Sequence, residues 1–185
     1  SDGDLDLAAC GGDPPRLYEN TGSALSGAPS WLAVSSGTAM ALAVGDLDLD
    51  GDPDLVVAGD GAPIRAYLND SGHLERAASW ESEILTSRTW DVALGDIDGD
   101  GDLDLVAGQE RAPNVLFENV AGQLGRVPTW RSQESDYTSS VGFADFDGDG
   151  DLDLMVGNAG APTIGQPPQA NRIYENRDGV LSSTV

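Results

Sequence analysis

Short apolar runs alternate with polar, glycine-rich segments along the whole chain. One set of runs lies at 39–45, 90–95 and 141–144, and each of these ends at an acidic segment. A second set follows at 55–57, 105–107 and 154–156 and is closed by glycine or a Gly-Ala-Pro corner. Runs this short, bounded by turn residues, are typical of β-strands and too short for helices. The pattern therefore predicts an all-β chain of short strands.

Two further strands are predicted after each pair of apolar runs, and the four strands together form one repeating group. A third strand is predicted at 65–68 and its copies, followed by turn residues at 69–72, 119–122 and 176–179. We expect this turn to form a hairpin into a fourth strand that ends near Trp80 or Trp130. Four antiparallel strands within about 40 to 50 residues are typical of a β-propeller blade.

The groups repeat at a nearly constant step. Asp46 and Asp96 are 50 residues apart, and Asp96 and Asp145 are 49 apart. The same step separates the members of three further series: Trp31, Trp80 and Trp130; Tyr18, Tyr67 and Phe117; Asn20, Asn69 and Asn119. We expect the tryptophans to pack between neighbouring blades. The fourth copy, with Tyr174 and Asn176, is displaced by an eight-residue insertion at 163–170.

The repeats predict one propeller-type domain over 1–185, with about 3.8 repeats of about 49 residues. The units are approximately 1–37, 38–87, 88–137 and 138–185. The first unit starts inside an acidic segment, and the last stops before its tryptophan. An open propeller exposes apolar faces and strand edges. We therefore expect an incomplete ring or part of a larger propeller, whose ends meet another copy of the chain or further repeats.

The charge of the chain adds a candidate metal. Thirty-two Asp and Glu oppose nine Arg, which gives a formal net charge of -23. This charge excludes nucleic-acid binding as a main role, and the absence of long apolar runs argues against membrane insertion. Eighteen of the 24 aspartates lie in four clusters. Such clusters of like charge need a counter-ion.

Each full cluster reads D-x-D-x-D-G-x-x-D. Carboxylates at positions one, three and five can wrap one ion, glycine at six permits the turn, and position seven offers a carbonyl. All-oxygen ligands favour calcium, about three ions in all, over zinc. An EF-hand is excluded because its position-twelve Glu is replaced by Val57, Ala107 or Val156. The predicted metal residues are Asp46, Asp48, Asp50, Asp52, Asp54, Asp96, Asp98, Asp100, Asp102, Asp104, Asp145, Asp147, Asp149, Asp151 and Asp153, with a partial site at Asp2, Asp4 and Asp6.

Residues 92–108 and 141–157 resemble the FG-GAP or VCBS repeats of integrin α-subunit propellers and of many secreted microbial proteins. The Tyr-Glu-Asn stretches at 18–20 and 174–176 are similar to the Asn-terminated strand of VCBS repeats. The resemblance implies a calcium-stabilised propeller that is extracellular or at the cell surface, in a mature secreted form. It also implies a glycan or protein ligand and a structural role for the metal.

A ligand surface is predicted where the repeats differ, on the edge opposite the acidic loops. The variable segments there are 81–89, 131–138 and the insertion. The residues predicted to form this surface are Trp90, Thr163, Gln166 and Gln169. Trp90 is an aromatic present in one copy only, and it is either a local core filler or a platform that stacks on sugar rings.

No enzyme is expected. His73 lies at a predicted hairpin tip, and Cys10 occupies a slot that holds Ala or Gly in the other units. The sequence contains no activated nucleophile and no phosphate-binding loop. A glycosidase pair among Glu81, Glu83, Glu110 and Glu134 is a minor alternative. The main alternative to a binding module is a structural unit of a cell-surface or extracellular polymer.

Overall fold

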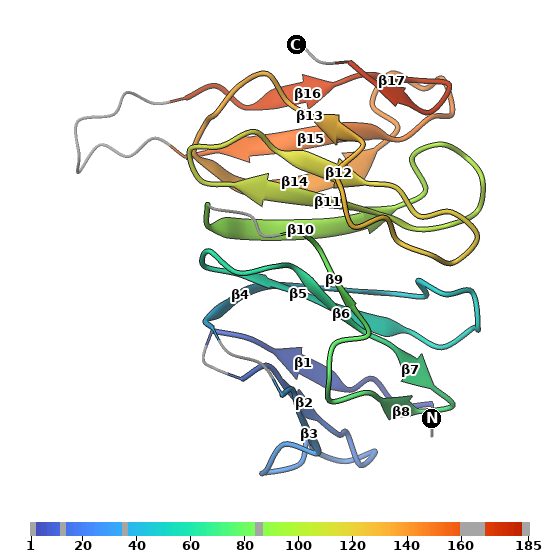
Figure 1. Ribbon diagram of the computed structural model, residues 1–185. Helices are drawn as coiled ribbons and strands as arrows, with labels where there is room; N and C mark the ends of the chain where they lie inside the picture. The colour runs from blue at the N-terminus through green and yellow to red at the C-terminus, as the bar shows by residue number, and fades with distance from the viewer. Residues whose placement is uncertain (1–2, 12–13, 35–36, 84–86, 160–168, 183–185) are drawn as a thin grey trace.

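The computed structural model in Figure 1 describes residues 3–11, 14–34, 37–83, 87–159 and 169–182. Every regular element in these residues is a strand, and every strand pair is antiparallel. The strands form successive sheets that are stacked along the molecule, with the sheet of β1 and the sheet of β16 at opposite ends of the stack (Figure 1). The described residues form no closed ring. The prediction of an all-β, incomplete propeller-type array is confirmed.

The sheets of three or four strands are the blades. Blade 1 contains β1 (Leu7–Ala9), β2 (Arg16–Tyr18) and β3 (Trp31–Leu32). Blade 2 contains β4 (Ala39–Gly45), β5 (Asp54–Gly59), β6 (Arg65–Tyr67) and β9 (Trp80–Glu81). Blade 3 contains β10 (Thr89–Gly95), β11 (Asp104–Gln109), β12 (Val115–Phe117) and β13 (Trp130–Arg131). Blade 4 contains β14 (Thr138–Ala144), β15 (Asp153–Asn158) and β16 (Arg172–Tyr174).

The prediction for the fourth strand is wrong in one respect. The turn after β6 closes a separate two-stranded ribbon, β7 (Asn69–Asp70) with β8 (His73–Leu74), and β17 (Asn176–Arg177) with β18 (Val180–Leu181) repeats it. The fourth strand, β9, does end near Trp80 as predicted and pairs with β6 through Ala66, but the turn does not lead into it directly. The reason is the tight turn at Ser71 and Gly72, both at positive φ, which folds the chain back on β7 before it returns to β6.

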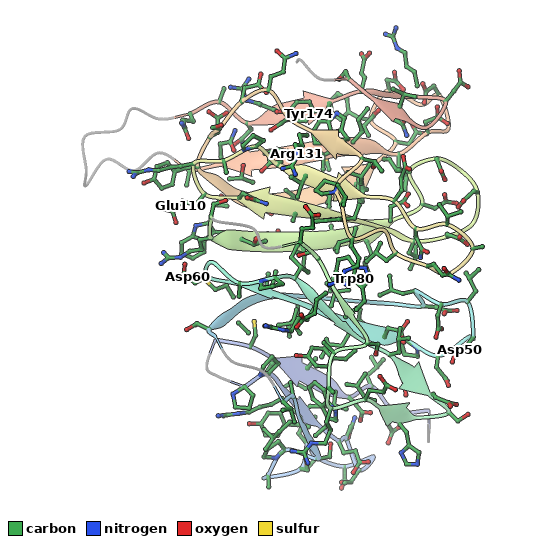
Figure 2. All side chains as sticks on the ribbon, in the orientation of Figure 1. Asp50, Asp60, Trp80, Glu110, Arg131 and Tyr174 are labelled. Atoms are coloured by element: carbon green, nitrogen blue, oxygen red, sulfur yellow. The ribbon has the colours of Figure 1, made fainter. Side chains whose placement is uncertain are left out.

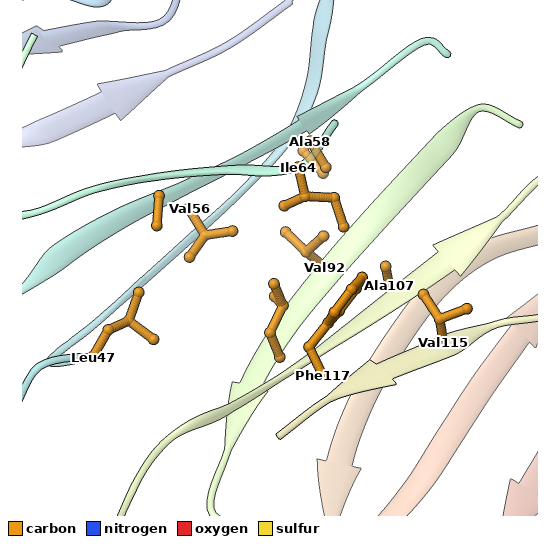
Figure 3. Packing of buried hydrophobic residues seen from close by; sticks show 11 residues of the cluster. Leu47, Val56, Ala58, Ile64, Val92, Ala107, Val115 and Phe117 are labelled. Carbon is orange, nitrogen blue, oxygen red and sulfur yellow. The ribbon is translucent and has the colours of Figure 1, made fainter. Parts of the chain in front are cut away.

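The hydrophobic core lies between the blades, because alternate residues of each strand point to opposite faces of its sheet. In β5, Leu55 and Val57 face blade 1, whereas Val56 and Ala58 face blade 3. Figure 3 shows the cluster between blades 2 and 3, where Val56 and its neighbours meet Phe117. Buried apolar residues from facing sheets fill each of the three interfaces between blades.

The predicted packing of the tryptophans is confirmed. Each one meets the aromatic residue of the following blade edge to face, a geometry that adds about 1 kcal/mol to simple burial. The ring centroids are 5.4, 5.7 and 5.1 Å apart in the pairs Trp31–Tyr67, Trp80–Phe117 and Trp130–Tyr174. Cys10 is half-buried against the cluster between blades 1 and 2, and burial raises the pKa of its thiol.

Candidate metal centres

Each acidic loop joins the first and second strands of a blade. The loops follow β4, β10 and β14 and lie together on one edge of the molecule, which Asp50 marks in Figure 2. Gly51, Gly101 and Gly150 have φ values of 93°, 96° and 103°. Side chains other than glycine rarely adopt this backbone, so the predicted role of glycine at position six is confirmed.

The loops bring carboxylate oxygens close together. Within each of three triads, one oxygen per residue lies within 4.8 Å of the others: Asp46, Asp48 and Asp50; Asp96, Asp98 and Asp104; Asp145, Asp147 and Asp153. Loop positions one and three occur in every triad, with position five or nine as the third member. Asp100 and Asp149 lie outside these triads, and each accepts the N–H of the residue two further on.

The aspartates at position seven use their side chains differently. Asp52 accepts the N–H of Ser71, Asp102 that of Gly122, and Asp151 that of Asp178. These bonds tie the loop to the turn of the ribbon that follows the third strand. One carboxylate oxygen of each is therefore engaged in the fold, and the predicted use of the backbone carbonyl as a metal ligand does not require this oxygen.

The aspartates at position nine are buried at the base of each loop. Asp104 is 0% exposed, and its oxygens accept the N–H groups of Ile97 at 2.9 Å and Asn119 at 2.8 Å. Burial raises the pKa of Asp104 to about 6, since these N–H bonds only partly offset the burial, and the charges of Asp98 and Asp100 raise it further. Burial likewise raises the pKa of Asp54.

Charge also accumulates at the mouth of each loop. Burial and the neighbouring aspartates raise the pKa values of Asp48, Asp98 and Asp147. Oδ1 of Asp46 is buried and has no hydrogen-bond partner. A buried carboxylate oxygen without a partner is costly, and a hard cation would satisfy it. The donor set is all oxygen, which fits calcium, so the residues present fit the predicted ion.

The partial site is only partly described. Asp2 lies outside the described residues. Oδ1 of Asp6 accepts the N–H of Asn20 at 2.8 Å, which is the bond that position nine makes in the other blades. Asp6 therefore occupies position nine, but neither Asp4 nor Asp6 belongs to a carboxylate triad among the described residues.

The opposite edge carries the predicted ligand surface. Trp90 is the extra residue of a β-bulge between Thr89 and Asp91, and bulges redirect side chains. The residue is 37% exposed, its Nε1–H donates to Glu110 at 3.0 Å, and the guanidinium carbon of Arg88 lies 5.2 Å from its ring centroid. Trp90 is thus a surface residue, not a core filler.

Gln169 reaches the same edge. Its Oε1 accepts the N–H of Tyr137, and Tyr137 forms a backbone bridge with Glu110, the partner of Trp90. Figure 2 shows Glu110 on the side of the molecule away from Asp50. The structure therefore brings Trp90 and Gln169 onto one edge, opposite the acidic loops. Thr163 and Gln166 lie outside the described residues.

His73 and the four glutamates named as a minor alternative for catalysis lie in separate surroundings. His73 is exposed in the ribbon of blade 2. Three of the four glutamates are paired with arginines: Glu81 with Arg65, Glu110 with Arg88 and Glu134 with Arg172. Glu134 also accepts the hydroxyl of Tyr174, whose pKa rises mainly through burial.

The fold and the loops together define an array of propeller-type blades with an acidic loop in each complete first hairpin. The FG-GAP-like repeat profile matches residues 1–57, 46–107 and 98–156, and the chain belongs to this family. FG-GAP-like repeats often bind calcium and are typical of extracellular proteins. Among the described residues, no helix is long and apolar enough to span a membrane.

No curated protein sequence matches the chain. Its fold is similar to that of a chain in the crystal structure of BBS1N in complex with ARL6DN, soaked with lead, with a TM-score of 0.63 and 16% identity. The match covers 100% of this chain and 52% of the other, so this chain spans about half the length of its structural relative. At this identity the likeness concerns the fold alone.

Proposed function

We propose that the protein is an extracellular, calcium-stabilised propeller module that binds a glycan on the edge opposite its calcium loops. The observation that carries the calcium part is the set of three carboxylate triads, together with the buried, unpartnered Oδ1 of Asp46. Calcium would relieve the repulsion within each loop and hold the first hairpin of each blade. Its role would be structural.

The glycan part rests on Trp90. Its indole is held by Glu110 through Nε1–H and by the guanidinium of Arg88, yet the residue is 37% exposed. A fixed aromatic ring beside charged and amide groups offers stacking for the apolar face of a sugar and hydrogen bonds for its hydroxyls. The other blades have Met40 and Ser139 at this bulge, so the arrangement occurs once in the described repeats.

A glycan array with the calcium-loaded chain, followed by titration calorimetry with any bound sugar, tests this assignment. Trp90→Ala should weaken binding at least about tenfold, which corresponds to about 1.4 kcal/mol. Met40→Ala, at the equivalent bulge of blade 2, is the matched control and should leave affinity unchanged. An array without a hit, or a ligand protein whose binding survives Trp90→Ala, contradicts the glycan assignment.

A structural role in assembly is the second candidate, favoured by the apolar faces of the end blades. Leu5 and Leu7 of blade 1 are 89% and 45% exposed, and Phe146 and Met155 of blade 4 are 64% and 36% exposed. The inner-blade counterparts of Leu7, Phe146 and Met155 are buried between sheets: Leu55 and Leu105, Leu47 and Ile97, and Val56 and Val106. A further blade, from another copy of the chain or from further repeats, would cover the exposed residues of the end blades. A monomeric mass in solution, unchanged by chelator, would contradict association between copies.

A further inference from the structure

One asparagine recurs two residues after the third strand and is buried in blades 3 and 4. Asn119 and Asn176 are 0% and 1% exposed. Their backbone N–H groups donate to the position-nine aspartates of their own blades, at 2.8 Å in both cases. The asparagine is therefore fixed at the base of one acidic loop by its main chain.

The side chain of this asparagine contacts two loops at once. Nδ2 of Asn119 donates to the carbonyl of Leu47 in loop 46–54 at 2.8 Å and to that of Leu103 in loop 96–104 at 3.3 Å. An amide nitrogen carries two hydrogens, so it can serve both carbonyls. One side chain thus joins the acidic loops of blades 2 and 3.

The next pair of loops is joined in the same way. Nδ2 of Asn176 donates to the carbonyl of Ile97 at 2.6 Å and to that of Leu152 at 3.1 Å. The three loops are therefore linked in series, 46–54 to 96–104 through Asn119, and 96–104 to 145–153 through Asn176. The bridged residues are 72 and 79 positions from their asparagines.

A second contact joins the same elements. A Cβ placed on Gly122 would lie 2.8 Å from the carbonyl oxygen of Asp48, and one on Gly179 would lie 2.8 Å from Cβ of Asp98. Asp48 and Asp98 belong to the carboxylate triads of the preceding blades. The turn after each asparagine therefore packs its backbone against the metal-binding residues of the neighbouring loop.

We propose that Asn119 and Asn176 couple the calcium loops, so that calcium binds neighbouring loops with positive cooperativity. This inference rests on the proposed calcium function, and the asparagines act as positioning residues, not ligands. Calcium in one loop fixes the carbonyl that the amide holds. The amide is then already ordered for the second loop, which binds at a smaller cost in conformational entropy.

Asn69 supplies an internal control. Its Nδ2 donates to the carbonyl of Pro53, in its own loop, at 3.0 Å. This carbonyl corresponds to those of Leu103 and Leu152, but among the described residues the amide reaches no second loop. Replacement of Asn69 should affect loop 46–54 without changing the coupling between loops.

The test follows calcium binding loop by loop in the full chain. The amide signals of Gly51, Gly101 and Gly150 report the three loops separately in NMR titrations, since each N–H donates to the first aspartate of its loop. Asp98→Asn, which impairs loop 96–104, should weaken calcium binding at the other two loops by roughly fivefold, the lower end of typical coupling. Calcium-saturated circular dichroism shows whether each variant is folded.

The asparagine variants then locate the coupling. With Asn119→Leu, Asp98→Asn should no longer affect loop 46–54 but should still affect loop 145–153. With Asn176→Leu, Asp98→Asn should no longer affect loop 145–153 but should still affect loop 46–54. Either variant alone therefore tests the coupling if the other does not fold. Asn69→Leu should leave both effects in place.

The two hypotheses fail differently. Loops that bind calcium with affinities independent of Asp98→Asn would overturn the coupling and leave the calcium function intact. Coupling that persists in both asparagine variants would overturn the role of the amides. If no glycine signal responds to calcium, the proposed function itself is wrong.

Discussion

Loops 96–104 and 145–153 are almost the same in sequence and differ sharply in surroundings. Eight of their nine residues are identical, and only position two differs, with Ile97 in one and Phe146 in the other. Ile97 is 2% exposed, whereas Phe146 is 64% exposed. Asn176 and Gly179 lie against loop 96–104, and no described residue takes their place at loop 145–153.

This difference shows that an acidic loop in this protein is completed by two blades. Its own blade supplies the carboxylates and the glycine turn. The following blade supplies the amide, the packed turn and the apolar cover for position two. Repeats with the same residues are thus not equivalent in energy, and the following predictions test how far they differ.

The largest effect is expected from calcium. At a thousandfold excess over the dissociation constant, one site adds about 4 kcal/mol to the free energy of unfolding. Chelation should therefore lower Tm by at least about 10 °C. Asp98→Asn should remove more of the calcium-dependent stabilisation than Asp147→Asn, because loop 96–104 is held on both sides. Thermal unfolding with and without chelator measures both; equal losses would show that the following blade does not matter.

The second effect concerns position two. Ile97→Ala opens a cavity in the core between blades 3 and 4 and should cost about 2–4 kcal/mol. Phe146→Ala, although it removes a larger side chain, should change stability by no more than about 0.5 kcal/mol. Urea unfolding compares the two. A large, concentration-dependent cost for Phe146→Ala would instead reveal that another copy covers this residue.

The third effect is a pH dependence centred on Asp104. In the metal-free folded chain its pKa is about 6, above the ordinary 3.8, so the folded state binds its proton more tightly than the unfolded state does. The free energy of unfolding should therefore fall as pH rises from about 4 to about 6, by up to roughly 3 kcal/mol.

Calcium should reverse this fall in stability with rising pH, because it binds the ionised carboxylate. At pH values under about 6, the affinity of loop 96–104 for calcium should therefore decrease. Urea unfolding of the calcium-free protein across this range measures the first effect, and Asp104→Asn should flatten it. If the free energy of unfolding of the calcium-free protein instead rises between pH 4 and 6 as Asp104 ionises, the raised pKa of Asp104 is contradicted.

The smallest change in stability is expected at position four of the loops, where loop 46–54 differs from the other two. Leu49 has φ of 66°, where Gly99 and Gly148 have 76° and 82°. Leucine in this region is strained by about 1 kcal/mol, so Leu49→Gly should stabilise the protein by up to about that amount. The reciprocal Gly99→Leu should destabilise it. Chemical denaturation resolves both, and a loss of stability in Leu49→Gly would show that its leucine side chain contributes more by packing.

The sequence by itself determined the features that are local and periodic. Short apolar runs bounded by turn residues set the strands, glycine at position six set the turn, and the spacing of Asp96, Asp98 and Asp100 set the candidate metal loop. The 49- or 50-residue step also located Trp80 and its copies between blades. These features depend on backbone conformation and on contacts that recur in every unit, so one chain displays them several times.

Tertiary structure decided what depends on neighbours distant in the chain. The recurrence of Asn119 was visible, but its bond to Leu47 was not, because nothing in the sequence shows which carbonyl a buried amide meets 72 residues away. The bulge that exposes Trp90 and the ribbon that precedes Trp80 arise from strand pairing. The unequal burial of Ile97 and Phe146 follows from which loop is covered by a following blade among the described residues, a property that two nearly identical sequences do not reveal.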